Sequence, residues 1–174
     1  MIKIVKLSHD LLAKHPSPEV ALDMTAGNGQ DTLFLSKISK KVYAFDIQEE
    51  AITKTLKLLE ENQVFNVEVI RESHDLFDIF VSEQIDLAIY NLGYLPSGNK
   101  DIKTEARIVI NSLRKLMNQL KSGAIVVIVI YLHNLEESKA IDEFVSNLSA
   151  DYDAMKHVVM NRSSSPYIIE IKKI

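Results

Sequence analysis

Residues 20–32 read VALDMTAGNGQDT. Apolar residues at Val20, Ala21, Leu22 and Met24 predict a buried strand, and the two glycines that follow allow a sharp turn. Apolar residues recur through 32–38, which predicts a helix there. Loops between a strand and a helix of an open α/β sheet gather free backbone N–H groups, and nucleotides bind at such loops. We therefore expect this loop to bind a nucleotide cofactor.

The residues around the two glycines indicate which cofactor. Thr32 stands where the dinucleotide fingerprint needs a third glycine, and the loop has no lysine for a P-loop. Asp23 ends the first strand and Asp46 ends the next, where an acid accepts ribose hydroxyls. S-adenosylmethionine fits better than NAD, because it has no pyrophosphate and its cationic end suits an acidic loop. The alternative is an ordinary strand-to-helix turn, with Asp23 and Asp46 as solvated turn residues or helix caps.

Length and composition limit the classes of protein to which the chain can belong. The 174 residues suit a single domain over 1–174, and a formal net charge of −4 does not suggest a nucleic-acid binder, although a local basic patch remains possible. The chain has no cysteine, which excludes disulfides, thiolate metal sites and a cysteine nucleophile. The longest apolar run, residues 124–132, is far shorter than the ~20 residues of a membrane span, and the N-terminus lacks a signal-peptide pattern. We expect a cytoplasmic protein.

Strand and helix patterns alternate along the whole chain. Five predicted strands, with a helix after each, precede two closing strands near enough to pair as an antiparallel hairpin. This order predicts an α/β, Rossmann-like class I methyltransferase fold: a mostly parallel seven-stranded sheet with helices on both faces and the C-terminal hairpin at one edge. The predicted strands are 20–24, 42–46, 67–70, 85–90, 124–130, 157–160 and 167–171, and the predicted helices include 3–14, 32–38, 49–62, 103–121 and 136–148.

A second chemical stretch, Asn91-Leu92-Gly93-Tyr94-Leu95-Pro96, follows the fourth strand. It is similar to the Asn-Pro-Pro-Tyr tetrapeptide of amino methyltransferases, in which the asparagine accepts hydrogen bonds from the target amine and the tyrosine stacks on its ring. Because ligands lie at the carboxyl ends of parallel strands, this stretch should share a cleft with the glycine loop and with residues 46–48, 73–75 and 131–134. The structural alternative is a capped and proline-stiffened turn.

The histidines allow weaker inferences. His74 and Asp75 follow the third strand, where Asp75 would accept from the adenine amino group, or where Ser73 or Asp75 would cap a short helix. His133, after the fifth strand, is either a general base or a surface residue. His9 and His15 share no helical face, so we expect no metal site.

Four stretches, in this order and spacing, resemble the bacterial YtqB/MnmM family: Asp23-x-Thr25-Ala26-Gly27-Asn28-Gly29-x-Asp31-Thr32, Phe45-Asp46-Ile47-Gln48, Ser73-His74 and Asn91-Leu92-Gly93-Tyr94-Leu95-Pro96. The resemblance implies an S-adenosylmethionine-dependent methyltransferase that converts the 5-aminomethyl group of a wobble 2-thiouridine in tRNA to 5-methylaminomethyl. It places the cofactor on Asn28, Gly29, Asp46, Gln48 and His74. The chain departs from the family at Tyr131-Leu132-His133-Asn134, which lacks the glycine of its relatives.

The predicted catalytic residues are Asn91 and Tyr94. The predicted cofactor-binding residues are Asp23, Thr25, Gly27, Asn28, Gly29, Asp31, Thr32, Asp46, Ile47, Gln48, Ser73, His74, Asp75, Asn91 and Leu92. The expected partner is the anticodon region of tRNA. A basic patch around the cleft would support RNA binding, as would a homodimer that joins two such patches; its predicted residues are Lys3, Lys6, Lys100, Lys103, Arg107 and Arg162. The alternatives are N-methylation of rRNA or of a small amine, and a non-catalytic domain that binds S-adenosylmethionine.

Overall fold

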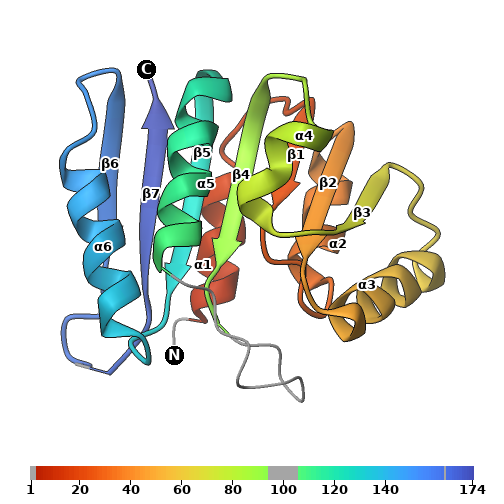
Figure 1. The fold of residues 1–174 in the computed structure, drawn as a ribbon, viewed down its shortest axis with the longest axis horizontal. Coiled ribbons are helices and arrows are strands. Elements are labelled where there is room, and N and C mark those ends of the chain that lie inside the picture. The colour runs from red at the N-terminus through yellow and green to blue at the C-terminus, as the bar shows by residue number, and fades with distance from the viewer. Residues whose placement is uncertain (1–2, 94–105, 163) are drawn as a thin grey trace.

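The computed structural model describes residues 3–93, 106–162 and 164–174 (Figure 1). In chain order the elements are α1 (Ile4–Leu12), β1 (Val20–Asp23), α2 (Gln30–Ile38), β2 (Lys41–Asp46), α3 (Glu49–Glu61), β3 (Val67–Arg71), the 3-10 helix η1 (His74–Leu76), α4 (Phe77–Phe80), β4 (Ile85–Asn91), α5 (Ala106–Gln119), β5 (Leu120–Ile130), α6 (Leu135–Ser146), β6 (Tyr152–His157) and β7 (Tyr167–Lys173).

The seven strands form one sheet in the order β3-β2-β1-β4-β5-β7-β6. Strands β1 to β5 run parallel, whereas β7 pairs antiparallel with both β5 and β6. The chain order reverses direction between β1 and β4, and this is the switch point at which open α/β sheets bind ligands. The predicted fold class, including the antiparallel hairpin at one edge, is confirmed.

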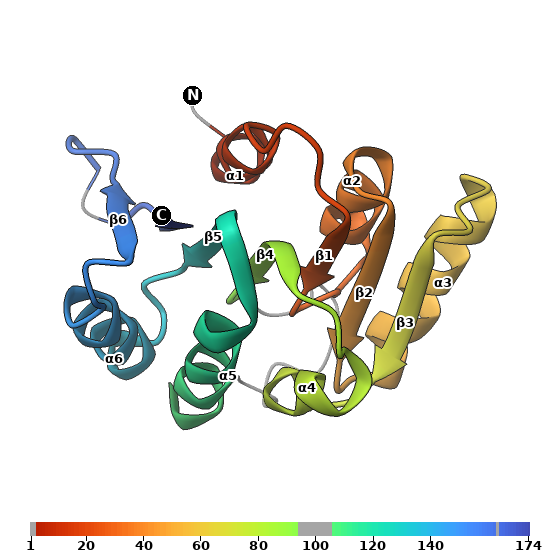
Figure 2. The ribbon, with the colours of Figure 1, turned by 90° about the horizontal axis from the view of Figure 1, so that it is seen from above.

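Helices cover both faces of the sheet (Figure 2). Helices α1, α2 and α3 lie on one face, and α4, α5 and α6 lie on the other. The first face packs around buried residues such as Leu12 and Leu35, and the second around Phe77 and Leu113. The interior strand β5 is buried without interruption from Ala124 to Ile130, as expected of a strand with helices on both faces of the sheet.

Two predicted strand boundaries were wrong. Helix α5 ends at Gln119 and β5 begins at once at Leu120, which pairs with Ile85; the register then shifts where Gly123 adopts a φ of +84°. A positive φ allows a bulge within a strand. We predicted that the strand starts after Gly123, but the glycine lies inside β5. The other error concerns β6, predicted at 157–160 but found at Tyr152–His157. Strand β6 lies at one edge of the sheet, where a strand can carry exposed polar residues and so lacks a continuous apolar run.

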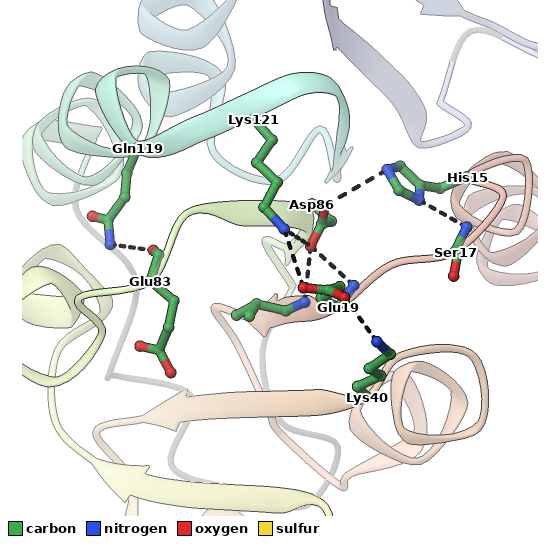
Figure 3. Close-up of polar contacts among 9 residues, drawn as sticks. His15, Ser17, Glu19, Lys40, Glu83, Asp86, Gln119 and Lys121 are labelled. Carbon is green, nitrogen blue, oxygen red and sulfur yellow. Dashed lines mark hydrogen bonds and ion pairs between the residues drawn. The ribbon is translucent and has the colours of Figure 1, made fainter.

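Asp86 ties the amino ends of three strands together (Figure 3). Its Oδ2 accepts hydrogen bonds from the backbone N–H groups of Glu19 and Val20, both at 2.9 Å, and from Lys121 Nζ at 3.1 Å. Burial alone would raise the pKa of Asp86, but the N–H donors and the Lys121 ammonium outweigh it and lower that pKa. This network lies at the end of the sheet opposite the glycine loop and belongs to the scaffold.

None of the helices within the described ranges is long and apolar enough to cross a bilayer.

Candidate active site

The glycine loop that follows β1 is held by the end of β2. The Ala26 N–H donates to the Phe45 carbonyl at 2.9 Å, and the Gly27 N–H donates to Asp46 Oδ2 at 2.9 Å. Gly29 has a φ of +82°, and a Cβ atom there would lie 3.0 Å from the Cα of Thr55. Glycine is therefore required here for two reasons: the backbone conformation is left-handed, and α3 passes too close to leave room for a side chain.

Asp23 and Thr32 support this loop from inside the protein. Both are fully buried, and the Thr32 hydroxyl donates to Asp23 Oδ2 at 2.6 Å while the Thr25 N–H donates to Oδ1 at 3.1 Å. Burial, and next the neighbouring Asp31, raise the pKa of Asp23. We predicted both residues as cofactor contacts, and this stays a prediction; in the structure their side chains are buried and hydrogen bonded to each other.

The end of β2 presents a different set of atoms. Asp46 accepts from the Gln48 N–H at 2.9 Å as well as from Gly27, and burial raises its pKa. The next residue, Ile47, leaves 49% of its surface exposed beside this carboxylate. The Asp46 carboxylate, oriented by backbone N–H groups, is suited to accept hydrogen bonds from ribose hydroxyls. The exposed Ile47 side chain beside it is suited to pack against the attached ring. Asn28 is also exposed, and its Oδ1 lies 3.4 Å from the Gln30 N–H.

His74 is the most unusual residue after β3. It is buried, and neither of its ring nitrogens has a hydrogen-bond partner among the residues that the structure describes. Burial lowers its pKa to about 4, so the ring is neutral and carries one donor and one acceptor. Its ring meets Tyr90 edge-on with centroids 5.5 Å apart. Buried polar atoms almost always have partners, so a buried histidine whose two ring nitrogens lack one among the described residues is an unusual feature of this end of the sheet.

Ser73 and Asp75 contact each other, and Asp75 also contacts α5. The Ser73 hydroxyl donates to Asp75 Oδ1 at 2.6 Å, and Asn111 Nδ2 donates to Asp75 Oδ2 at 3.0 Å. Burial would raise the pKa of Asp75, but these two donors outweigh it and lower that pKa. Ser73 is the N-cap residue of η1, as the structural alternative predicted, but its side chain makes no capping hydrogen bond.

Asn91 ends β4 beside the glycine loop. Its backbone N–H donates to Thr25 Oγ1 at 2.8 Å, and its side-chain Nδ2 donates to Asp31 Oδ2 at 3.0 Å. Leu92 is buried, and its N–H donates to the Val129 carbonyl at 3.0 Å. The two stretches that the sequence identified separately therefore meet at Thr25 and Asp31. Tyr94, the other predicted catalytic residue, lies outside the described residues.

Tyr131 and His133 follow β5 at the same end of the sheet. A Cβ atom on Gly93 would lie 3.4 Å from the Tyr131 ring, so this ring packs against the 91–93 turn. Burial, and next the charge of Asp31, raise the pKa of Tyr131. His133 is exposed, with its ring centroid 6.3 Å from that of Tyr131.

His9 is a residue that the sequence alone did not connect to the site. Its Nε2 lies 2.6 Å from Asp31 Oδ1, although it comes from α1. We considered it only as a metal ligand, and no local motif links it to residue 31. The one available signal was a histidine on the helix that precedes the glycine loop.

Comparison with known proteins gives a consistent result. Residues 42–173 match the model of a family described as "Putative rRNA methylase". The chain is 30% identical over 169 residues to an Arabidopsis thaliana protein named tRNA (mnm(5)s(2)U34)-methyltransferase, chloroplastic. This match covers 87% of the chain but 62% of the relative, so the chain spans less than two thirds of the length of that protein.

Solved structures resemble the chain over its whole length. A "putative methyltransferase" from Streptococcus mutans in complex with SAH superposes with a TM-score of 0.94 at 35% identity, covering 100% of this chain and 99% of that one. A "putative rRNA-methylase" from Clostridium thermocellum gives a TM-score of 0.95 at 31% identity, with 100% of both chains covered. These are the proteins that the chain is similar to in sequence and in fold.

Proposed function

The chain belongs to the family described as "Putative rRNA methylase" and is an S-adenosylmethionine-dependent methyltransferase, and we propose that it N-methylates the 5-aminomethyl group of the wobble 2-thiouridine in tRNA. The observation that carries the proposal is the state of the Asn91 side chain. Its amide nitrogen is occupied by Asp31, and no described residue donates to its carbonyl oxygen. We propose this oxygen as the acceptor for an N–H of the target amine.

The name of the Arabidopsis thaliana relative specifies this nucleoside modification in tRNA, and it supports the choice of substrate. The stretch Asn91-Leu92-Gly93, which is similar to the amino methyltransferase motif, supports the choice of a nitrogen target. Both features favour an exocyclic amine over a ring carbon. The chain also has no cysteine to supply the covalent nucleophile used for pyrimidine carbon atoms.

The mechanism is direct transfer to a neutral amine. S-adenosylmethionine supplies an electrophilic methyl group on its sulfonium and leaves as S-adenosylhomocysteine. Asn91 Oδ1 accepts an amine N–H, which turns the nitrogen lone pair toward the methyl carbon. With the cofactor bound, the carbon–nitrogen bond would form as the carbon–sulfur bond breaks, and the nitrogen would then release a proton to solvent. A neutral acceptor in a partly desolvated site favours the free amine over its ammonium form.

The cofactor contacts that we propose are those at the carboxyl ends of β1, β2 and β3. Gly29 and the exposed Asn28 would lie along the cofactor, Asp46 and Gln48 would hold the ribose, and Ile47 and His74 would flank the adenine ring. Asp46 is already fixed by two backbone N–H groups, so its carboxylate is oriented before any ligand arrives.

The RNA would approach the same end of the sheet. Arg107 near the start of α5 and Arg162 in the β6–β7 connection are both exposed, and these segments adjoin the carboxyl ends of β4 and β5. Lys6, also in the predicted patch, pairs with Asp10 at 2.7 Å. Lys100 and Lys103 lie outside the described residues. We propose that arginines of this end contact the anticodon region, and that a homodimer would enlarge the surface.

Methylation of rRNA is the second candidate, and the description of the family favours it. It would use the same cofactor and the same end of the sheet. The two candidates differ in the RNA that carries the target.

Nucleoside analysis by mass spectrometry separates these candidates. Both tRNA and rRNA from a strain lacking the protein are compared with RNA from the same strain complemented by the wild type or by Asn91→Ala. We expect 5-aminomethyl-2-thiouridine to accumulate in tRNA and to disappear only with the wild-type gene. Unchanged tRNA with a missing methyl group in rRNA would replace the proposal by the second candidate.

A further inference from the structure

Helix α2 holds the His9 ring at both its edge and its face. Asp31 Oδ1 lies 2.6 Å from His9 Nε2, and Phe34 stacks on the imidazole with centroids 3.9 Å apart and planes 3° from parallel. Asp31 and Phe34 are three residues apart, so they lie on the same side of α2. The plane of the His9 ring is therefore set by Phe34, and the contact with Asp31 directs its Nε2 toward the carboxylate.

Asp31 divides its two oxygens between two partners. Oδ1 faces His9, and Oδ2 accepts from Asn91 Nδ2 at 3.0 Å. The residue is 6% exposed, so solvent does not compete effectively for either bond. A chain of contacts thus runs from α1 through α2 to the end of β4.

We infer that His9 and Asp31 are positioning residues that fix the orientation of the Asn91 carboxamide. The inference rests on the proposed function for its catalytic consequence, because Asn91 is the predicted acceptor for the amine. It gives Asp31 a role different from the cofactor contact predicted from the sequence.

The physical reason lies in the near symmetry of an amide. Rotation of the Asn91 carboxamide by half a turn exchanges its oxygen and nitrogen with almost no change in shape. One orientation offers an acceptor to the amine, and the other offers a donor that repels its N–H groups. A carboxylate accepts but does not donate, so Asp31 selects the orientation that leaves Oδ1 for the substrate. The Nε2–H of His9 in turn prevents the carboxylate from rotating away.

The first test needs no substrate. In ¹⁵N-labelled protein, the Asn91 side-chain NH₂ signals are assigned by their absence in Asn91→Ala. His9→Phe keeps a flat ring against Phe34 but removes the donor, whereas His9→Gln keeps an N–H donor without the ring. We expect the Asn91 signals to move and broaden in His9→Phe and to remain close to wild type in His9→Gln. Unchanged signals in His9→Phe would overturn the inference.

The second test measures turnover on tRNA together with the dissociation constant of S-adenosylmethionine. We expect His9→Phe to lower kcat about tenfold with no change in cofactor affinity, since the reacting geometry is lost and the binding surface is kept. His9→Gln should retain most of the turnover. In an Asp31→Ala background, His9→Phe should not lower kcat any further, because His9 contacts Asn91 only through the Asp31 carboxylate.

A kcat loss of the same size in the Asp31→Ala background would show that His9 does not act through Asp31, and it would reject the inference. If the wild type methylates no tRNA while the Asn91 signals still depend on the His9 donor, the proposed function fails and the positioning role stands. The two failures are therefore distinguishable.

Discussion

The Asn91 side-chain amide donates to the Asp31 carboxylate at 3.0 Å, although 60 positions separate the two residues in the chain. This bond joins the helix that follows the glycine loop to the end of β4. The glycine loop, the start of α2 and the stretch proposed to bind the amine are therefore in direct contact.

Asn91→Ala removes the proposed acceptor and leaves the glycine loop in place. We expect kcat to fall about 100-fold, as for other single hydrogen-bonding groups aimed at a reacting atom, with S-adenosylmethionine affinity within about twofold of wild type. Steady-state kinetics and calorimetric titration of the cofactor measure the two quantities. Asn118→Ala, the same change at an exposed position of α5, is the control. Equal losses of turnover and affinity would assign Asn91 to cofactor binding instead.

Gly29→Ala should destabilise the protein and weaken cofactor binding. The new Cβ would lie 3.0 Å from the Thr55 Cα, at a φ of +82°. Gly123→Ala is a matched control, because Gly123 has a φ of +84° and no atom within 4 Å of its Cβ position. Strain at such a φ costs about 1 kcal/mol or more for either variant. Urea unfolding should show a larger loss for Gly29→Ala, and only this variant should lose cofactor affinity.

Glu137 should make the protein less stable as the pH rises. It is 3% exposed, its Oε2 has no hydrogen-bond partner among the described residues, and burial raises its pKa from 4.5 to about 7. Between these values the unfolded state loses the proton and the folded state keeps it, so the free energy of unfolding decreases over this range and stays low above it. The penalty reaches about 3 kcal/mol at pH 8.

Glu137→Gln should remove that dependence. We expect the variant to gain stability relative to wild type at pH 8 compared with pH 5, measured by urea unfolding at both values. Glu136→Gln, the exposed neighbour, should follow the wild type. A Glu137→Gln curve parallel to that of the wild type would mean that the carboxylate is not desolvated in the folded state.

Asp86→Ala should destabilise the scaffold without affecting the site. It leaves the Glu19 and Val20 N–H groups without their acceptor, which costs about 2–4 kcal/mol. Because the folded pKa of Asp86 is lowered, its contribution is present above the unfolded pKa and is lost as the pH falls through the folded one. Thermal unfolding at pH 7 and pH 3 should show a smaller wild-type advantage at pH 3 than at pH 7, with cofactor affinity unchanged.

Periodicity and turn chemistry predicted the strand order and the layers because β1 to β5 alternate with amphipathic helices. They misplaced β6 because an edge strand carries exposed residues such as Asp153 and Lys156, and its position is determined by pairing with β7. The apolar residues Val158 and Met160, which suggested the wrong range, are 48% and 89% exposed.

The sequence predicted which segments meet in the candidate site where those segments directly follow a strand. The glycine loop, Asp46 and Asn91 each end a strand or follow one, and the parallel sheet brings them to one end. His9 was not predictable, because its contact with Asp31 depends on how α1 packs beside α2. The support given by Asp23 was also hidden, since the sequence does not distinguish a buried carboxylate from one that faces a ligand.

The most direct test of the central claim uses purified protein, S-adenosylmethionine with an isotopically labelled methyl group, and tRNA that carries 5-aminomethyl-2-thiouridine. Nucleoside mass spectrometry follows the label, and the Asn91→Ala protein provides the comparison. We predict that the wild type transfers the labelled methyl group to the aminomethyl nitrogen and that the variant does so about 100-fold more slowly. A wild-type protein that binds the cofactor and leaves this nucleoside unlabelled would contradict the account.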